Sequence, residues 1–330
     1  MRGDRVGPTV LVRAEMDALP IHEISDVAYR SRHHGVMHAC GHDAHTTIAT
    51  VVAERLAKCR DELRGTIRFA FQPAEEIAGG AVKMIEEGAI ENPAVDAAIA
   101  LHVLPELAAG TVAVASGPVW AAVDELRWTV RGKSGHAAYP HQHVDTIVVA
   151  AQIVTALQTV VSRSSSPFTP AVLSIGSIHG GTTWNVIPEY VEMHGTLRTF
   201  DPQVRERLME RMRAISTGVA MSMEATCEVE DRYSAPPVVN DGELALWMRD
   251  TLVPLHGEDQ VAVSAPSAGG DDFAFFAERS RGCVFHLGVR NVERGITNGL
   301  HNSGFDLDEG ALPVGAASLD AILRTLLARI

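Results

Sequence analysis

Apolar, β-branched runs alternate with stretches of helical periodicity over the first hundred residues. Strands are expected at Thr9 to Met16, Gly65 to Gln72 and Val95 to Val103, and helices at Asp43 to Lys58 and Gly80 to Glu87. This alternating order is typical of α/β proteins. Because the second and third strands are apolar along most of their length, we expect a mostly parallel sheet that is buried on both faces by helices.

The pattern changes in the middle of the chain. Strands are expected at Leu126 to Gly132, Ala171 to Ile178, Glu189 to Phe200 and Ala225 to Val229, with helices from Val144 to Ser162 and from Asp201 onwards. Asp201 is an N-cap residue followed by proline at the first helical position. The order β-α-β-β-α-β is that of a ferredoxin-like unit. We therefore predict a ferredoxin-like domain, residues 120–233, inserted into the α/β domain.

The α/β pattern resumes after the insertion. A helix is expected at Glu243 to Leu255, a strand at Cys283 to Val289 and a closing helix at Gly310 to Ala328. The predicted α/β domain is thus discontinuous, with residues 1–119 and 234–330.

Composition narrows the classes of function. The formal net charge of −13, with no cluster of Lys or Arg, argues against a nucleic-acid or anionic-membrane partner. No apolar run is expected to cross a bilayer, and the first residues lack the apolar core of a signal peptide, so we expect a cytoplasmic protein. The four cysteines are too scattered for a disulfide framework, and three of them are expected to be small buried residues.

The densest group of candidate ligands lies between His38 and His45. This run holds three histidines, Cys40 and Asp43, and Gly41 lets the backbone bend so that Cys40 and His42 can converge. Thiolate and imidazole groups bind divalent transition metals. The spacing is not the paired Cys-x-x-Cys of a structural zinc module, and a solvated polar loop is an equal alternative, so further ligands must come from elsewhere.

Polar residues also follow the predicted parallel strands, whose carboxyl ends bind ligands in open α/β sheets. Asp17 follows the first strand, Glu75 and Glu76 follow the second, and His102 ends the third. Two adjacent carboxylates allow one to bind a metal while the other takes a proton from water. The alternatives are acids that favour a helix start and an ordinary strand-end histidine. Together with Cys40 and His42, these residues favour a metal site.

Several weaker candidates stand alone in predicted loops or strands. His301 precedes the final helix, Asp271 and Asp272 form a second acid pair, and His136 follows the first strand of the insertion. The alternatives are an ordinary surface or loop histidine for His301 and His136, and a helix start for the acid pair. Asn185 lies in a glycine-rich loop, and Arg198 near a strand end can bind a carboxylate through two hydrogen bonds, although a solvent-facing arginine is the commoner case.

Eight motifs, in order and over nearly the whole chain, closely resemble one family. It is the amidohydrolase family of hippurate hydrolase, N-acyl-amino-acid deacetylases and plant indole-acetyl-amino-acid hydrolases, related to aminoacylase and carboxypeptidase G. The motifs are Arg13-Ala-Glu-Met-Asp17-Ala-Leu-Pro20, Met37-His-Ala-Cys-Gly-His-Asp43, Gln72-Pro-Ala-Glu-Glu76, Leu101-His102, Gly135-His-Ala-Ala, Asn185-Val-Ile-Pro188, Gly195-Thr-Leu-Arg198 and Leu300-His301-Asn302.

The resemblance implies a function and a role for each matching residue. It implies hydrolysis of N-acyl amino acids to a carboxylic acid and a free amino acid, with two divalent metals per subunit, manganese or zinc first and cobalt or nickel as alternatives. Cys40 would stand where more distant relatives use a bridging aspartate. The implied metal ligands are Cys40, His42, Glu76, His102 and His301.

The same resemblance assigns the remaining roles. Glu75 would be the general base, and His136 would stabilise the oxyanion from the inserted lid of the other subunit in a homodimer. Arg198 and Asn185 would bind the substrate carboxylate, and Asp17 would support a ligand. In the opening cluster, His38 and His45 would support the ligands, and His33 and His34 would be loop residues.

Departures from the family pattern are few. Glu15 stands where aspartate is usual and Asp271 where glutamate is usual. The reach of each of these supporting carboxylates is therefore expected to differ from the family pattern by one methylene group. The chain begins close to its first core strand and is thus short at its N-terminus relative to the family.

Rival interpretations of the function are a dipeptidase or N-carbamoyl-amino-acid hydrolase, and a truncated metal-binding relative without turnover. Glu75, His136 and Arg198 argue against the last, because metal binding alone requires none of them.

Overall fold

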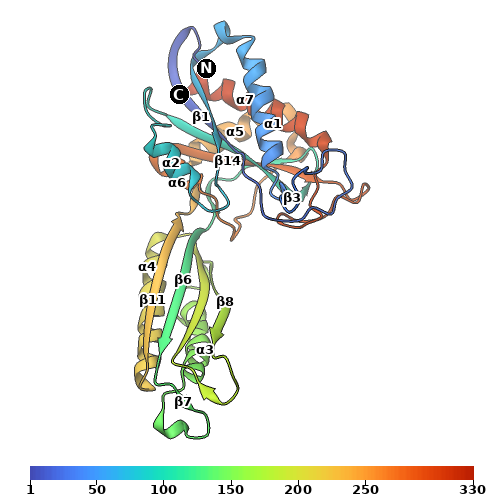
Figure 1. Cartoon of the computed structure of the whole chain (residues 1–330). Helices are drawn as coiled ribbons and strands as arrows, with labels where there is room; N and C mark the ends of the chain where they lie inside the picture. Colours follow the sequence, from blue (N-terminus) through green and yellow to red (C-terminus); the bar gives the residue numbers. More distant parts are fainter. The chain divides into compact units, whose positions relative to one another are not determined.

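The protein, described here over all residues 1–330 by a computed structural model, divides into two compact units (Figure 1). Unit 1 comprises Met1–Val119, Val238–Pro266 and Asp271–Ile330, and unit 2 comprises Trp120–Pro237 and Ser267–Gly270. Unit 2 therefore ends four residues beyond the expected 233 and also includes the short segment 267–270. That segment belongs to unit 2 because the Ala121 N–H donates to the carbonyl oxygens of Ser267 and Gly269.

Unit 1 is built on a six-stranded, mostly parallel sheet. The strand order is β13-β4-β14-β3-β1-β2. The four long strands β2, β1, β3 and β14 are parallel neighbours, whereas β4 pairs antiparallel with β14, and β13 pairs parallel with β4. The strands are β1 (Arg5–Glu15), β2 (Arg64–Gln72), β3 (Ala97–Ala108), β4 (Val112–Ala113), β13 (Val261–Ala262) and β14 (Arg281–Arg290), and β5 (Gly117–Trp120) pairs separately with β12 (Val238–Asn240).

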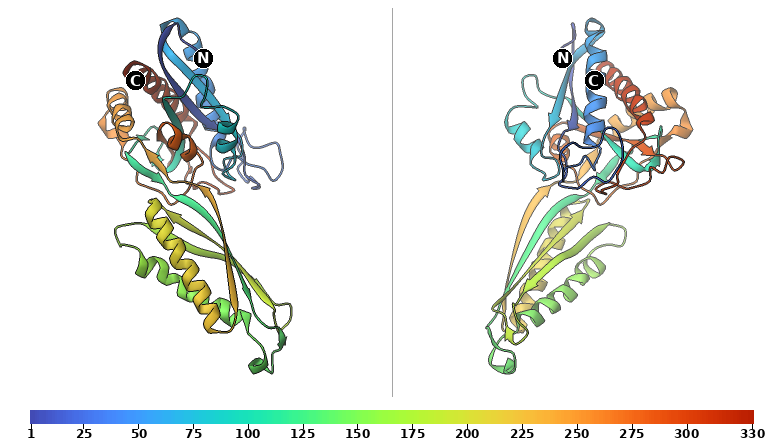
Figure 2. Two further views of the ribbon diagram at one scale, coloured as in Figure 1. Left: turned by 90° about the vertical axis from the view of Figure 1, so that its left-hand side faces the viewer. Right: turned by 45° about the vertical axis from the view of Figure 1, so that its right-hand side comes forward.

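Helices cover both faces of this sheet, as the apolar strands predict (Figures 1 and 2). α1 (His42–Ala57), α5 (Gly242–His256) and α7 (Leu312–Arg329) pack side by side, while α2 (Gly80–Glu86) and α6 (Ala274–Arg279) contact each other. Alternate residues of β1 face the two layers, so the strand is buried from Pro8 to its end. Short 3₁₀ turns occur at Arg60–Glu62, Pro140–Gln142, Glu258–Gln260 and Glu309–Ala311.

The third strand is longer than the sequence predicts. It was expected to end at Val103, with His102 at its end, but β3 continues to Ala108. The reason is that its pairing with β14 continues from His102 opposite His286 to Ala108 opposite Arg290. The parallel pairing of β1 with β3 stops at Ala100, whereas β1 itself ends at Glu15. His102 therefore lies inside a strand, beyond the point where β1 and β3 are paired.

Unit 2 has the element order β-α-β-β-α-β that the pattern predicts. Its antiparallel sheet has the order β11-β6-β10-β8, and its two long helices pack against each other and against the sheet. Asp201 caps α4 by accepting from the N–H groups of Gln203 and Val204. The elements are β6 (Ala122–Arg131), α3 (Thr146–Ser164), β8 (Ala171–Gly180), β10 (Tyr190–Thr199), α4 (Pro202–Ser222) and β11 (Thr226–Ala235), with a small pair of strands β7 (Gly135–His136) and β9 (Val186–Ile187).

Two helices correct the expectation that no segment could cross a bilayer. Thr146–Ser164 and Glu309–Arg329 are long and apolar enough by length and composition, each with a mean hydropathy of 1.4. Both also supply core residues, such as Leu157 in unit 2 and Leu323 in unit 1. Because core helices of globular proteins have the same length and composition, these two indicate a membrane span only weakly.

All four cysteines are free thiols. Cys40 and Cys283 are buried, but Cys59 and Cys227 are only partly buried, so fewer are fully buried than expected. The partly buried pair lie at the end of α1 and on the edge strand β11 of unit 2, where packing covers one side only.

Gly41 fixes the start of α1. It is the N-cap residue with a φ of +78°, a left-handed conformation that side chains rarely adopt. A Cβ at this position would lie 2.5 Å from Cγ2 of Val103 on β3. Only glycine lets the chain turn here against β3, and the turn places Cys40 and His42 on either side of it.

Candidate metal centre

The five predicted metal ligands come together in unit 1. Cys40 and His42 flank the start of α1, Glu76 follows β2, His102 lies on β3, and His301 lies in the loop before α7. Sγ of Cys40 is 3.7 Å from Nε2 of His102. Nε2 of His42 is 3.9 Å from one carboxylate oxygen of Glu76, and Nε2 of His301 is 3.5 Å from the other. Four separate segments therefore meet at the ends of β1 and β2.

The donor atoms fit a divalent transition metal. Nε2 of His42 and Oε1 of Glu76 are buried and have no hydrogen-bond partner. Buried polar atoms are almost always paired, so two facing orphans require an explanation such as a cation. Ligand atoms of Cys40, Glu76 and His301 also lie within 4.8 Å of one another. A set of sulfur, imidazole nitrogen and carboxylate oxygen suits a divalent transition metal.

Asp17 contacts two of the predicted ligands, His42 and Glu76. Nδ1 of His42 lies 3.0 Å from the carbonyl oxygen of Asp17 and 3.3 Å from its Oδ1. Oδ2 of Asp17 accepts from the backbone N–H of Glu76 at 3.0 Å. Burial alone would raise the pKa of Asp17, but the hydrogen bonds from His42 and Glu76 outweigh it and leave that pKa lowered. Asp17 is therefore a stable anion behind His42 and Glu76.

His102 and Cys40 are held in a dry environment. Nδ1 of His102 is 2.7 Å from the carbonyl oxygen of Val103, which turns Nε2 toward Cys40. Burial lowers the pKa of His102 to about 4, so the ring is neutral, the form that binds metals. Burial and the charge of Glu76 raise the pKa of the Cys40 thiol. A thiolate here consequently needs a cation beside it.

Glu75 lies next to the ligands but faces a second group of acids. Its carboxylate lies within 4.8 Å of ligand atoms of His42 and Glu76, and also of carboxylate oxygens of Asp271 and Asp272. Burial and the charge of Asp271 raise the pKa of Glu75 well above its usual range. A carboxylate with raised proton affinity beside a metal site is suited to general-base catalysis.

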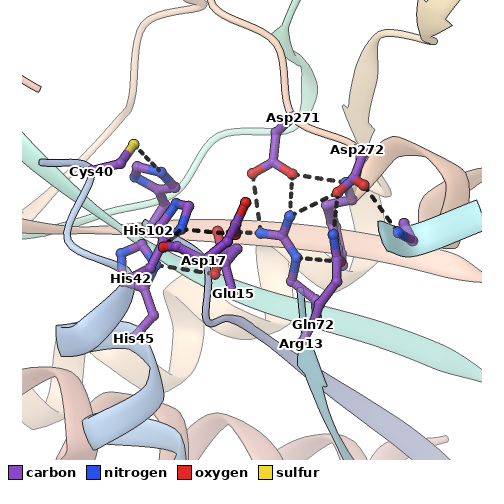
Figure 3. A network of polar contacts seen from close by, with 12 residues as sticks. Arg13, Glu15, Asp17, Cys40, His42, His45, Gln72, His102, Asp271 and Asp272 are labelled. Carbon is purple, nitrogen blue, oxygen red and sulfur yellow. Dashed lines mark hydrogen bonds and ion pairs between the residues drawn. The ribbon is translucent and has the colours of Figure 1, made fainter. Parts of the chain in front are cut away.

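Arg13 is the centre of a buried network that sequence reasoning missed (Figure 3). Its guanidinium donates to Gln72 at 2.9 Å, to both carboxylate oxygens of Asp271 at 2.6 and 3.2 Å, and to Asp272 at 3.0 Å. It also pairs with Glu15. The sequence held one signal for this network: two charged residues at alternate positions of an otherwise apolar strand.

His45 lies beside the candidate ligands, but both of its ring nitrogens already have partners in the protein. Its Nδ1 is 3.0 Å from Oε2 of Glu15, and its Nε2 accepts from the N–H of Val103 at 2.9 Å. Burial lowers the pKa of His45 to about 4, so the ring is neutral and links β1 to β3.

The remaining predicted site residues lie in unit 2. His136 on β7 is exposed and pairs with Val186, and the carbonyl of the neighbouring Asn185 accepts from the Ala137 N–H at 3.1 Å. Arg198 is on β10, opposite Val123, whereas Tyr190 at the start of β10 is opposite Arg131 at the end of β6. Eight residues of strand correspond to about 25 Å. Within unit 2, His136 and Asn185 are thus together, and Arg198 lies toward the other end of the sheet.

Comparison with known proteins identifies the family. The sequence pattern of Peptidase family M20/M25/M40 matches residues 11–325. The chain is 40% identical over 310 residues to an N-acetyl-L-cysteine deacetylase of Bacillus subtilis, covering 94% of this chain and 72% of the relative. It is 36% identical over 322 residues to the IAA-amino acid hydrolase ILR1-like 4 of Arabidopsis thaliana, covering 96% and 72%.

A solved structure of the same family has the same fold. The YXEP protein of Bacillus subtilis, a dinuclear metal binding peptidase from the M20 family, superposes with a TM-score of 0.86 and 36% identity. The match covers all of this chain and 84% of that one. The chain belongs to the M20/M25/M40 peptidase family and is a metal-binding hydrolase of amide bonds.

The role of Asp17 can be tested by replacing it with asparagine. We expect Asp17→Asn to weaken divalent-metal affinity about 10- to 100-fold, because the ring of His42 and the backbone of Glu76 both lose a charged partner. Competition with a chromophoric chelator measures this. Asp43→Asn is the matched control, since that exposed carboxylate in the first turn of α1 accepts only from Ala44. Equal affinity in the wild type and Asp17→Asn would contradict the assignment.

Proposed function

We propose that this protein hydrolyses the amide bond of N-acyl amino acids of the hippurate or N-acetyl-amino-acid type, releasing a carboxylic acid and a free amino acid. The observation that carries the proposal is the pair of buried, unpartnered atoms of His42 and Glu76 beside Glu75. These atoms combine a cation site with a base of raised proton affinity. The relatives that are deacetylases and amino-acid hydrolases support the same chemistry.

The two carboxylate oxygens of Glu76 face different histidines, His42 and His301, and this separates the proposed ligands into two groups. We assign Cys40, His42, Glu76, His102 and His301 as ligands of two divalent cations per subunit, with manganese or zinc first and cobalt or nickel as alternatives. Such cations, when bound, supply an acidified water and a positive charge for the carbonyl oxygen. Asp17 and Asp271 support this arrangement from behind His42 and Glu75.

Glu75 performs the proton transfers in this proposal. Its carboxylate takes one proton from the attacking water as the oxygen bonds to the amide carbon. The protonated Glu75 then gives that proton to the leaving nitrogen as the carbon–nitrogen bond breaks. The raised pKa of Glu75 suits both steps, because the group must hold the proton between them.

Unit 2 is proposed to be a ferredoxin-like lid that also mediates a homodimer. Arg198 and Asn185 bind the α-carboxylate of the substrate, and His136 stabilises the oxyanion. The separation within unit 2 supports a dimer: His136 and Asn185 lie about 25 Å along the sheet from Arg198. One lid cannot surround a single small substrate with all three residues. We therefore propose that His136 and the neighbouring Asn185 serve the centre of the other subunit, where they meet the Arg198 of that subunit's own lid.

We propose a cytoplasmic location because the thiols of this protein must stay reduced. All four cysteines are free, and Cys40 must remain reduced to bind a metal. The reducing cytosol maintains thiols in this state.

A product-resolved screen tests the function. Metal-free protein is loaded with manganese, zinc, cobalt or nickel and offered acetyl-, benzoyl- and carbamoyl-amino acids beside dipeptides. We expect release of the acyl acid and free amino acid from acetyl or benzoyl substrates. Preferential cleavage of dipeptides or carbamoyl substrates would replace the proposal with one of those activities, and metal binding without turnover of any would support a non-catalytic relative.

The different roles proposed for the adjacent carboxylates, Glu75 as general base and Glu76 as metal ligand, give a second prediction. Glu75→Gln should lower kcat by about 10²- to 10⁴-fold, the usual value of a general base, while metal content stays intact. Glu76→Gln is the matched variant and should lose metal. Metal analysis beside steady-state kinetics measures both. If Glu75→Gln loses as much metal as Glu76→Gln, the assignment of base and ligand is wrong.

Arg198 gives a third prediction. Arg198→Ala should raise KM about 10-fold or more for substrates with a free α-carboxylate, because a charge-assisted hydrogen bond is lost. The matching carboxamide substrates serve as the control, since their KM should change little. Equal effects of the substitution on carboxylate and carboxamide substrates would remove Arg198 from the substrate site.

A further inference from the structure

The segment between β2 and α2 carries both Glu75 and Glu76 in a strained backbone. Ala74 and Ala78 have φ values of 58° and 50°, which cost an ordinary side chain about 1–2 kcal/mol each. The two ends of the segment lie very close, since a Cβ on Gly80 would lie 1.7 Å from the carbonyl oxygen of Pro73. Strained residues persist only where the surrounding structure holds them. Something must therefore hold the ends of this loop together.

Asp272 contacts both ends of the loop. Its Oδ1 accepts from Nε2 of Gln72, the last residue of β2, at 2.6 Å. Its Oδ2 accepts from the backbone N–H of Ala81, in the first turn of α2, at 3.0 Å. Asp272 is fully buried. One rigid carboxylate thus bridges the residues that enter and leave the loop.

Arg13 fixes the position of Asp272. Nη2 of Arg13 donates to Oδ1 of Asp272 at 3.0 Å, and Nε donates to Oε1 of Gln72 at 2.9 Å. Two further N–H groups bind Asp271, and another pairs with Glu15. A guanidinium has five N–H groups, and each has a contact here. Arg13 is fully buried, so no alternative partner from solvent competes for it.

We propose that Asp272, hydrogen-bonded to Arg13, is a positioning residue that clamps the Glu75–Glu76 loop in the conformation needed for catalysis. The inference rests on the proposed function for the roles of Glu75 and Glu76. Figure 3 shows Asp272 in contact with both Arg13 and Gln72, on the side of the network away from Cys40 and His102. The two oxygens of Asp272 are occupied by Gln72, Arg13 and Ala81, and in this proposal they bind neither the metals nor the substrate. Asp272 acts by setting the position of two residues, and a misplacement of about 1 Å can cost 10²-fold in rate.

Replacing Asp272 with asparagine removes one of its hydrogen bonds to the ends of the loop, with little change in side-chain size. The two oxygens of Asp272 both accept hydrogen bonds, whereas an asparagine amide has one accepting oxygen and one donating nitrogen. In either orientation its nitrogen faces a donor, either the Ala81 N–H or the side chains of Gln72 and Arg13. Gln72→Met is a second, milder variant that breaks the hydrogen bond between Gln72 and Asp272 without changing charge.

The test measures local exchange and catalysis in the full-length protein. Hydrogen–deuterium exchange of the metal-free protein is followed for peptides covering residues 73–81 and for peptides of α7. We expect Asp272→Asn and Gln72→Met to speed exchange in the first segment at least 10-fold and to leave α7 unchanged. Loaded with metal, both variants should lose 10- to 100-fold in kcat, with KM within about threefold of wild type. Asp241→Asn, which breaks a carboxylate–arginine pair with Arg281 elsewhere in unit 1, is the control and should change neither.

Two outcomes would overturn the clamp. The first is unchanged exchange in residues 73–81, whatever happens to kcat. The second is faster exchange spread equally over 73–81 and α7, which would make Asp272 a general stabilising residue. Absence of turnover in the wild-type protein would instead refute the proposed function, and the exchange data on metal-free protein would still decide whether Asp272 holds the loop.

Discussion

The buried guanidinium of Arg13 is the interaction on which the candidate centre depends. A fully buried charge is tolerated only when it is paired and hydrogen-bonded, and Arg13 has three carboxylates and an amide around it. The carboxylates outnumber the cation, and burial raises the pKa of Asp271 and Asp272 despite the lowering effect of Arg13. Arg13 makes it possible for these acids to be buried directly behind Glu75.

From this cation, contacts extend in two directions. In one direction, Glu15 binds His45, which accepts from the N–H of Val103 next to the candidate ligand His102. In the other direction, Gln72 and Asp272 hold the ends of the loop that carries Glu75 and Glu76. Residues on β1, β2, β3 and α1 are thereby linked through one side chain. The precision of a metal centre comes from such supporting contacts as much as from its ligands.

Much of the fold followed from periodicity alone. The order of the long strands and helices, and the capped start of α4 at Asp201, could be predicted because hydrophobic spacing and capping are local properties. Strand ends were less predictable: β3 continues beyond His102 because β14 pairs with it, and no local signal shows a partner about 180 residues away. The apolar character of α3 and of Glu309–Arg329 was likewise underestimated.

The sequence by itself determined the family and the candidate ligand residues, because Cys40, His42, Glu75, Glu76, His102 and His301 lie in short motifs of specific residue types. Only the tertiary structure decided what supports them. Arg13 and Glu15, His45, and Asp272 lie in three separate segments of the chain, and no single segment shows the contacts that join them. Their roles arise from burial, since a charge removed from water must find its partners wherever the fold brings them.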